Sequence, residues 1–366
     1  MSTGYPAVAE LAVTGVGVVS PWGDDPETAL AGGAAPAPDG AWFDHRARLG
    51  PRGYKYLPPA ARYVLAAARA ALADGGCPGA HPADRRGLLL ATNAGLAGLF
   101  DTMDATVAAD GAAGIPPASA PYFAVNVLGN RLAAELSLNG FALTVATART
   151  AALDALSTGA LAVAAGRCDT LLLAAAEEPV PAARGGAGET GAVALALEPA
   201  AAARARGAEV RATLWSRSLF VPPPALDTPD GRAQADRVLT AALTRMLPPA
   251  ADASPAFHLD LDSSAVSEAV TAAVTGLPGR PPGSPAEGPH PDGLPDAGDP
   301  TGPGRPLPPH RTGCLGPALA VARAVAARAG GDRLVVCATG AGHVALVRVS
   351  PVPPHHTQES QHAEAA

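Results

Sequence analysis

The sequence predicts an α/β protein whose sheet is covered by helices on both faces. Short runs rich in Val, Leu and Ala, such as residues 11–19 and 86–92, alternate with stretches in which apolar residues recur at helical spacing, such as residues 58–74. The short runs are apolar throughout instead of alternating with polar residues, which is typical of strands buried on both faces. Glycines end most of the helical stretches, so the elements are clearly separated.

The first half of the chain contains the clearest elements. Residues 11–19 predict a buried strand followed by a turn at residues 20–23, and residues 58–74 predict a helix that stops at two glycines. The other predicted strands in this half are residues 86–92, 142–147, 169–176 and 189–198. The other predicted helices are residues 96–109, 125–138 and 151–165.

The second half repeats the alternation less clearly. Its predicted strands are residues 209–216, 256–261, 333–338 and 343–349, and its predicted helices are residues 234–247, 264–274 and 315–328. Residues 275–309 contain 12 Pro and 8 Gly, too many for a helix or a strand ladder, and predict a disordered insert. Residues 350–366 are polar and contain prolines, which predicts a flexible tail.

The composition excludes several classes of protein. Hydrophobic residues make up 48% of the 366 residues, enough for a sizeable core, and the net charge of −7 argues against a nucleic-acid binder. No apolar run of membrane-spanning length is free of charges and turn residues, and residues 1–10 lack the pattern of a signal peptide. We therefore expect a cytoplasmic protein that binds neither nucleic acid nor membrane.

The sequence contains no convincing cofactor or metal motif. The four cysteines are far apart and form no CxxC pair, so neither a zinc site nor a disulfide framework is indicated. Thr14-Gly15-Val16-Gly17 resembles the start of a dinucleotide-binding fingerprint, but the third glycine and the acidic ribose ligand do not follow at the required spacing. We expect no cofactor and no bound metal.

Four blocks of sequence, in this order and spacing, carry a family resemblance. They are LAVTGVGVVSPWG (11–23), FDHRARLGPRGYKYL (43–57), LTVATARTAALDALSTGALAVAAGRCDTLLLAAAEE (143–178), and TGCLGPALAVARAV (312–325) with LVVCATGAGHVALVRV (334–349). Together they resemble the β-ketoacyl synthases of the thiolase fold, and most of all the chain length factor, or ketosynthase β, subunit of type II polyketide synthases. The resemblance covers residues 9–349 apart from the insert.

This resemblance implies a thiolase-like five-layered α-β-α-β-α sandwich built from two related halves, residues 1–198 and 199–349, with the insert in the second. Members of the family form homodimers or heterodimers through a strand that corresponds here to residues 142–147. Active members catalyse a decarboxylative condensation. A cysteine at a helix N-terminus takes an acyl group from an acyl carrier protein, and two histidines help to decarboxylate the malonyl extender.

The position of the nucleophile is degenerate in this sequence. The family pattern T-A-C corresponds to Thr147-Ala148-Arg149, so an arginine replaces the cysteine. A guanidinium stays protonated and cannot act as a nucleophile, which excludes acyl-enzyme formation by the family mechanism at Arg149. A buried arginine also needs an acidic partner, for which Glu177 and Glu178 are candidates. Alternatively, Arg149 fills or shapes the former acyl pocket.

The two histidine positions of the family are degenerate as well. The first corresponds to Asp262, and chain length factors tend to have an aspartate there. The second corresponds to Cys314, in a turn that is one residue shorter than that of the family. The lysine that precedes this turn in the family falls near His310 or Arg311. All three catalytic residue types are therefore missing from their places.

Three further side chains are candidates for lining the pocket. Thr150, beside Arg149, is a possible substitute nucleophile but needs a base within hydrogen-bond reach. His343 lies in the closing glycine turn, which lines the pocket in the family, and His310 lies near the position of the family lysine. The structural alternative for Cys314 is a small buried residue, and for His343 a turn residue that packs on the sheet.

The leading hypothesis is a catalytically silent ketosynthase-like subunit that pairs with an active ketosynthase and helps to set chain length. A second hypothesis is a divergent acyltransferase or condensing enzyme that uses Thr150 or Cys314 as nucleophile. A third is a homodimeric module that docks an acyl carrier protein without chemistry, through arginines such as Arg46, Arg48 and Arg52.

Overall fold

The computed structural model describes residues 10–31, 42–76, 81–180, 189–247, 255–277, 313–328 and 331–353. Within these residues nine strands form a mixed sheet in the order β3-β2-β4-β5-β1-β6-β9-β8-β7, which confirms the predicted α/β class. Most of the predicted insert and of the predicted tail lies outside the described residues, as does His310.

The first five strands form one half of the sheet. In it, β2 runs parallel to β3 and β4, whereas β5 runs antiparallel to both β4 and β1. These strands are β1 (Leu11–Val19), β2 (Arg86–Ala91), β3 (Ala142–Val145), β4 (Thr170–Glu177) and β5 (Gly191–Pro199). Every residue of β4 is buried, as the unbroken apolar runs predict for strands covered on both faces.

The last four strands repeat this pattern in the second half of the sheet. They are β6 (Ala212–Phe220), β7 (Ala256–Leu261), β8 (Arg333–Ala338) and β9 (His343–Pro351). In the order β6-β9-β8-β7, with only β7 and β8 parallel, they match β1-β5-β4-β2. The described residues of this half contain no strand equivalent to β3. The halves join where Leu11 of β1 pairs with Leu214 of β6.

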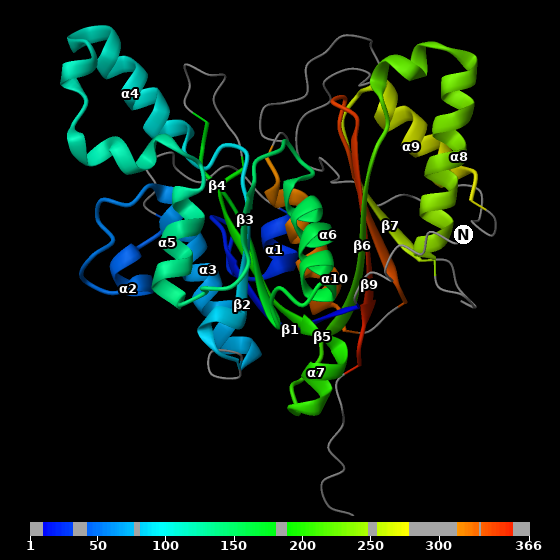
Figure 1. The fold of residues 1–366 in the computed structure, drawn as a ribbon, viewed down its shortest axis with the longest axis horizontal. Coiled ribbons are helices and arrows are strands. Elements are labelled where there is room, and N and C mark those ends of the chain that lie inside the picture. The colour runs from blue at the N-terminus through cyan, green and yellow to red at the C-terminus, as the bar shows by residue number, and fades with distance from the viewer. Residues whose placement is uncertain are drawn as a thin grey trace, which may run out of the picture.

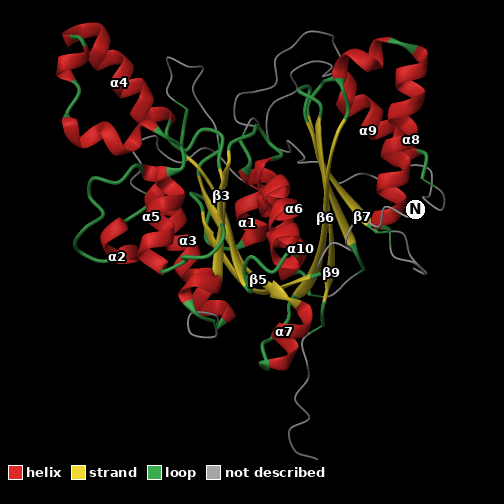
Figure 2. Ribbon diagram, in the orientation of Figure 1, coloured by secondary structure: helices red, strands yellow, loops and turns green. Residues whose placement is uncertain are grey.

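Helices complete five layers, as the resemblance implies (Figures 1 and 2). α3 (Pro59–Gly75) and α5 (Val127–Leu136) cover the outer face of the first half, and α8 (Pro229–Met246) and α9 (Ala265–Thr275) cover that of the second. Between the two halves lie α6 (Ala151–Ala164) and α10 (Leu315–Ala326), whose side chains share one apolar core with both. The remaining α-helices are α1 (Pro26–Ala31), α2 (His45–Leu49), α4 (Ala97–Asp110) and α7 (Ala200–Ala205).

The glycines of the Thr14–Gly17 stretch serve packing. A Cβ at Gly15 would lie 2.0 Å from the carbonyl oxygen of Ala71, and one at Gly17 would lie 2.0 Å from that of Ala67. Both carbonyls belong to α3, so the two glycines let this helix approach β1 closely. Close helix packing therefore explains the pattern that resembles a nucleotide-binding motif.

Several element boundaries differ from the predicted ones for identifiable reasons. The predicted start of α8 at residue 234 was wrong, because the helix begins at Pro229 after Thr228, whose side chain accepts a hydrogen bond from Gly231 N. Proline at the first helical position and threonine at the cap are the usual signals of a helix start. α1, α2 and α7 have only five or six residues each and were not predicted.

Among the described residues, none of the helices combines the length and the apolar character that crossing a bilayer requires.

Gly17→Ala is expected to lower the free energy of unfolding by about 1–3 kcal/mol, because its Cβ would meet the backbone of α3. Gly331→Ala is the matched control, since a Cβ there has no heavy atom within 4 Å. Urea unfolding of both variants measures the difference, and equal stabilities would contradict the assigned role of Gly17.

Candidate functional site

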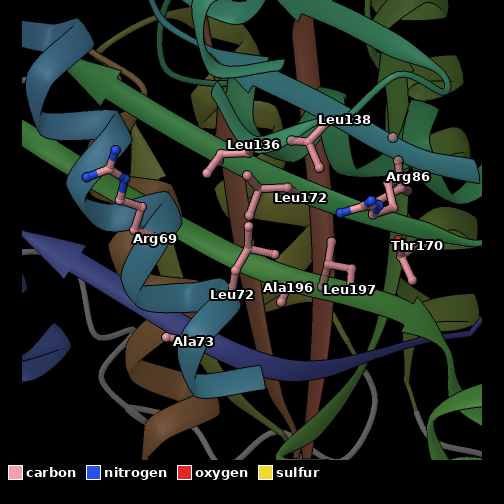
Figure 3. A pocket seen from close by; sticks show the side chains of 12 residues that line it. Arg69, Leu72, Ala73, Arg86, Leu136, Leu138, Thr170, Leu172, Ala196 and Leu197 are labelled. Atoms are coloured by element: carbon pink, nitrogen blue, oxygen red, sulfur yellow. The ribbon is translucent and has the colours of Figure 1, made fainter. Parts of the chain in front are cut away.

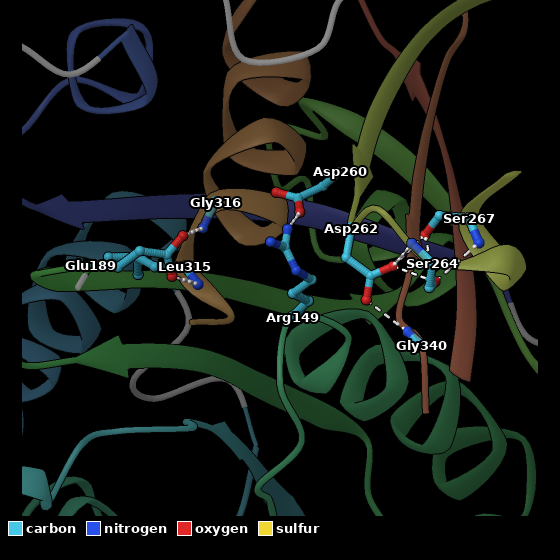
Figure 4. A network of polar contacts seen from close by, with 9 residues as sticks. All are labelled: Arg149, Glu189, Asp260, Asp262, Ser264, Ser267, Leu315, Gly316 and Gly340. Carbon is cyan, nitrogen blue, oxygen red and sulfur yellow. Dashed lines mark hydrogen bonds and ion pairs between the residues drawn. The ribbon is translucent and has the colours of Figure 1, made fainter. Parts of the chain in front are cut away.

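A network of polar side chains lies where α6 and α10 begin, in the middle layer of the sandwich (Figure 4). Arg149 directly precedes Thr150 at the start of α6, Asp260 lies in β7, and Glu189 precedes β5. Residues from both halves of the sheet therefore meet at the position where the resemblance places the nucleophile.

Arg149 is held by an ion pair that joins the two halves. Its side chain is 4% exposed and donates from Nη1 to Oδ1 of Asp260, which is also buried. The backbone φ of Arg149 is 58°, a left-handed conformation that costs a residue with a side chain about 1–2 kcal/mol. An acidic partner was correctly expected, but the proposed partners Glu177 and Glu178 were wrong.

Glu177 cannot serve as that partner because it holds backbone groups. Its carboxylate accepts hydrogen bonds from the N–H groups of Asn93 at 2.8 Å, Ala94 at 2.6 Å and Cys314 at 3.0 Å. Burial raises its pKa, and these hydrogen bonds oppose that rise in part. Glu177 thereby ties the loop after β2 to the start of α10.

Glu178 also accepts hydrogen bonds from backbone N–H groups, on the outer side of the sheet. It accepts hydrogen bonds from Gly98 N at 2.9 Å, in the first turn of α4, and from Ala60 N at 3.5 Å, in the first turn of α3. Its side chain is buried, and burial raises its pKa to about 7. Both carboxylates at the end of β4 therefore have structural partners other than Arg149.

Glu189 occupies the N-terminus of α10. Its two carboxylate oxygens accept hydrogen bonds from Leu315 N at 2.7 Å and Gly316 N at 2.8 Å. These N–H groups have no partner within the helix, and a carboxylate there is also favoured by the helix dipole. Although the residue is not fully enclosed, burial of its carboxyl group, with Glu177 and Asp260 nearby, raises its pKa to about 8.

Cys314 is enclosed by the same carboxylates. It is fully buried at the N-cap of α10. Burial first, and then the charges of Glu177 and Glu189, raise the pKa of its thiol well above the ordinary value. Since the thiolate is the reactive form of cysteine, this environment gives Cys314 the character of an inert core residue.

Thr150 is also fully buried. Its hydroxyl lies 3.3 Å from that of Thr147, and within the described part of the chain this is the one side-chain partner that it has. Among the described residues, therefore, no base is hydrogen-bonded to the Thr150 hydroxyl to take its proton, as a nucleophilic hydroxyl requires.

Asp262, at the first degenerate histidine position, fastens two elements together. It accepts hydrogen bonds from Ser267 Oγ at 2.7 Å, near the start of α9, and from Gly340 N at 2.7 Å, in the turn between β8 and β9. Burial works to raise the pKa of Asp262, but the hydrogen bonds from Ser264, Ser267 and Gly340 outweigh it and lower the pKa. Figure 4 shows Asp262 facing these partners, with Asp260 facing Arg149.

His343, the remaining described pocket candidate, lies at the first position of β9. Its ring packs edge-on against Phe220, with ring centroids 5.6 Å apart. Phe220 is 55% exposed, so this contact belongs to the surface end of the β6–β9 pair. The structure therefore places His343 against Phe220, whereas Arg149 is paired with Asp260.

Sequence reasoning missed Asp260 and Glu189, the two acidic residues that complete the network. Asp260 is an acidic residue within the otherwise mostly apolar strand β7, and such a residue needs a buried partner. Glu189 gave a weaker signal, because acidic residues before a strand are usually solvated.

One apolar void lies beside this network and is small. A void of about 10 Å³ lies between α6, α10 and the inner face of the first half of the sheet. Its walls include Leu153 and Leu156 of α6 and Val321 of α10. This volume is no larger than one water molecule requires, so this void cannot hold an acyl chain.

Asp260→Asn is expected to lower the free energy of unfolding by about 3–5 kcal/mol, because it leaves the Arg149 guanidinium buried without a counter-charge. The double variant Arg149→Met, Asp260→Leu is expected to recover most of this loss of stability. An apolar pair of similar volume often gives a protein about the same free energy of unfolding as the buried ion pair that it replaces. Urea unfolding gives both values, and a double variant that loses at least as much as Asp260→Asn would contradict the coupling.

Stability is also expected to depend on pH through Glu189. Its folded pKa of about 8 lies above the ordinary value of 4.5, so its contribution is complete below 4.5 and is lost as the pH rises through 8. Glu189→Gln should flatten this fall in the free energy of unfolding, whereas Glu268→Gln, at an exposed glutamate of α9, should not. Equal pH profiles for the wild type and Glu189→Gln would contradict the assignment.

The sequence and the fold of this chain are similar to those of known proteins. Residues 27–208 match the family model of the β-ketoacyl synthase N-terminal domain, whereas no curated protein sequence matches the chain. One similar structure is AntDE:AntF, described as a type II PKS acyl-carrier protein in complex with its ketosynthase, with TM-score 0.69 and 17% identity over 94% of this chain and 100% of that one.

Two further solved structures have the same fold. The ishigamide ketosynthase/chain length factor has TM-score 0.65 and 19% identity over 94% of this chain and 100% of its own. A β-ketoacyl synthase from Burkholderia phymatum has TM-score 0.61 and 16% identity over the same shares. The match to the family model shows that residues 27–208 belong to the β-ketoacyl synthase family, and the likenesses to solved structures show that the chain has the thiolase-like fold.

Proposed function

We propose that this chain is a catalytically silent ketosynthase-like subunit of polyketide or fatty-acid type chain assembly. It pairs with an active β-ketoacyl synthase, contributes to the wall of the acyl tunnel and so helps to set chain length. The observation that carries the proposal is the buried ion pair between Arg149 and Asp260, which stands at the position of the family nucleophile.

The charges and hydrogen bonds at the site support the proposal that the chain is catalytically silent. A guanidinium cannot attack a thioester, and Arg149 is committed to Asp260. An oxyanion would need free N–H donors. At the start of α10 the N–H groups of Leu315 and Gly316 already bond to Glu189. In the part of the chain that the structure describes, the site thus offers no activated nucleophile, and the carboxyl group of Glu189 occupies these donors.

The alternative of a displaced nucleophile has less support. Cys314 is fully buried beside two carboxylates that disfavour its thiolate, and Thr150 is fully buried with only the hydroxyl of Thr147 beside it. Neither residue has the exposed, activated setting that covalent catalysis needs.

The free edge of β3 supports pairing. β3 is the first strand of the sheet order, so one edge of its backbone has no partner strand among the described residues, and its residues are exposed or half-buried. Leu161 on neighbouring α6 is 49% exposed, although this helix lies in the middle layer. An open strand edge beside an exposed apolar side chain is a surface that readily pairs with another chain.

An arm beside this part of the fold is largely exposed among the described residues. α4 and the 3₁₀ turns that follow it project from the body of the molecule, as Figure 1 shows. Met103 is the one residue of α4 that is buried, whereas Val107 is 43% exposed and Phe123, at the end of the turns, is 58% exposed. A projecting arm with exposed apolar side chains suits contact with a second subunit.

The descriptions of two similar structures fit the proposed assembly. One describes an acyl-carrier protein in complex with its ketosynthase, and the other a ketosynthase/chain length factor. By analogy, we propose that an active ketosynthase is the partner of this chain and that an acyl carrier protein binds transiently to the resulting heterodimer.

Co-expression with a ketosynthase from the same gene neighbourhood tests the proposal. We expect a one-to-one complex by native mass measurement, whose activity with malonyl-loaded carrier protein needs the partner's cysteine. A chain that stays monomeric with every such ketosynthase would contradict the proposal.

Leu161→Arg is expected to weaken the complex at least tenfold, because it would place a charge in the proposed interface beside β3. Val238→Arg is the matched control, since Val238 is 40% exposed on α8, on the opposite outer layer, and should leave the affinity unchanged. Sedimentation at several concentrations measures both affinities. Equal weakening by the two variants would place the interface elsewhere.

A further inference from the structure

A second, separate cavity lies on the outer face of the first half of the sheet (Figure 3). It has a volume of about 200 Å³ and lies between α3, the end of α5 and the strands β2, β4 and β5. Arg86 and Thr170 mark its position at the amino ends of β2 and β4. Arg149 precedes α6 on the other face of this half, so the cavity is distinct from the degenerate site.

The cavity has an apolar interior. Its walls include Leu72 of α3, Leu136 of α5, Leu138, and Leu172 and Ala196 of the neighbouring strands β4 and β5. Leu172 and Ala196 are 1% exposed, so the floor is part of the core, while Leu72 and Leu136 are half-buried at its mouth. Burial of apolar ligand surface here would be favourable by about 25 cal/mol per Å².

Polar groups stand at one end of this interior. Arg86 and Thr170 are directly paired in the register of β2 and β4, and both lie among the residues that line the cavity. Figure 3 shows the guanidinium of Arg86 reaching toward the space beside Leu172. A guanidinium has five N–H donors, so Arg86 can bind a ligand carboxylate whatever else it contacts.

Neighbouring charges leave this end attractive to an anion. Glu198 follows Leu197, which pairs with Leu171 in the register of β4 and β5, and Arg206 neutralises its carboxylate through Nε at 3.0 and 3.1 Å and Nη2 at 2.6 Å. Asp169, which precedes Thr170, is paired with Arg85 at 2.5 Å. Arg69, also in the wall, donates to Glu135 at 2.7 Å, so that pair is neutral as well. Arg86 adds a positive charge to the polar end of the cavity.

We propose that this cavity binds an aliphatic monocarboxylate of about six to eight carbon atoms. The carboxylate lies against Arg86 and the Thr170 hydroxyl, and the chain lies among Leu72, Leu138 and Leu172. The size follows from volume, since an apolar cavity of about 150 Å³ accommodates a six-carbon ring. The inference does not depend on the function proposed for the degenerate site.

Calorimetric titration of the full chain with octanoate and with 1-octanol tests the proposal. The two probes share the apolar chain and differ in the charge of the head group. We expect octanoate to bind at least tenfold more tightly than 1-octanol. Arg86→Met should remove this difference, and Arg237→Met, which deletes an exposed charge on α8, should preserve it.

A variant that closes the cavity separates binding there from binding elsewhere. Ala73→Trp places a large side chain at the exposed rim of the cavity and should abolish binding of both probes. The proposal is overturned if wild-type protein binds no octanoate at millimolar concentration, if octanoate binds no better than 1-octanol, or if Arg86→Met binds octanoate as the wild type does.

Discussion

The burial of a permanent positive charge is the constraint on which the centre of this molecule depends. Arg149 is enclosed between the two halves of the sheet, and a guanidinium cannot escape the cost of burial by losing its proton. The ion pair with Asp260 meets this cost and, because Asp260 belongs to β7, connects the start of α6 to the second half. Arg149, which we propose to stand at the position of the family nucleophile, thus links the two halves.

The acidic side chains around this pair are also buried and also have hydrogen-bond partners within the protein. Glu177 and Glu189 each accept backbone N–H groups at the start of α10, where helix geometry leaves donors unsatisfied. In an active enzyme, donors at such a helix end would be available to a reacting oxygen. Here the protein's own side chains occupy them, and the thiol of Cys314 is enclosed beside them. The centre has the character of a core rather than of an open site.

Much of the fold could be predicted from the sequence, because strands buried on both faces produce unbroken apolar runs such as those of β2 and β4. Short helices such as α2 and α7 could not, since five or six residues carry too little periodicity. At the site, the sequence could predict that Arg149 needs an acidic partner, but it could not predict which acidic residue that partner is. Glu177 and Glu178 are closer along the chain, whereas Asp260 lies 111 residues away and meets Arg149 only because the second half of the sheet packs against α6.

The central claim is that this chain cannot carry an acyl group, and mass measurement tests it most directly. The complex with its ketosynthase would be incubated with acyl-loaded carrier protein, and the intact mass of each chain would then be recorded. We expect an acyl adduct on the partner and an unchanged mass for this chain. An acyl adduct on this chain, located by peptide mapping to Thr150, Cys314 or any other residue, would contradict it.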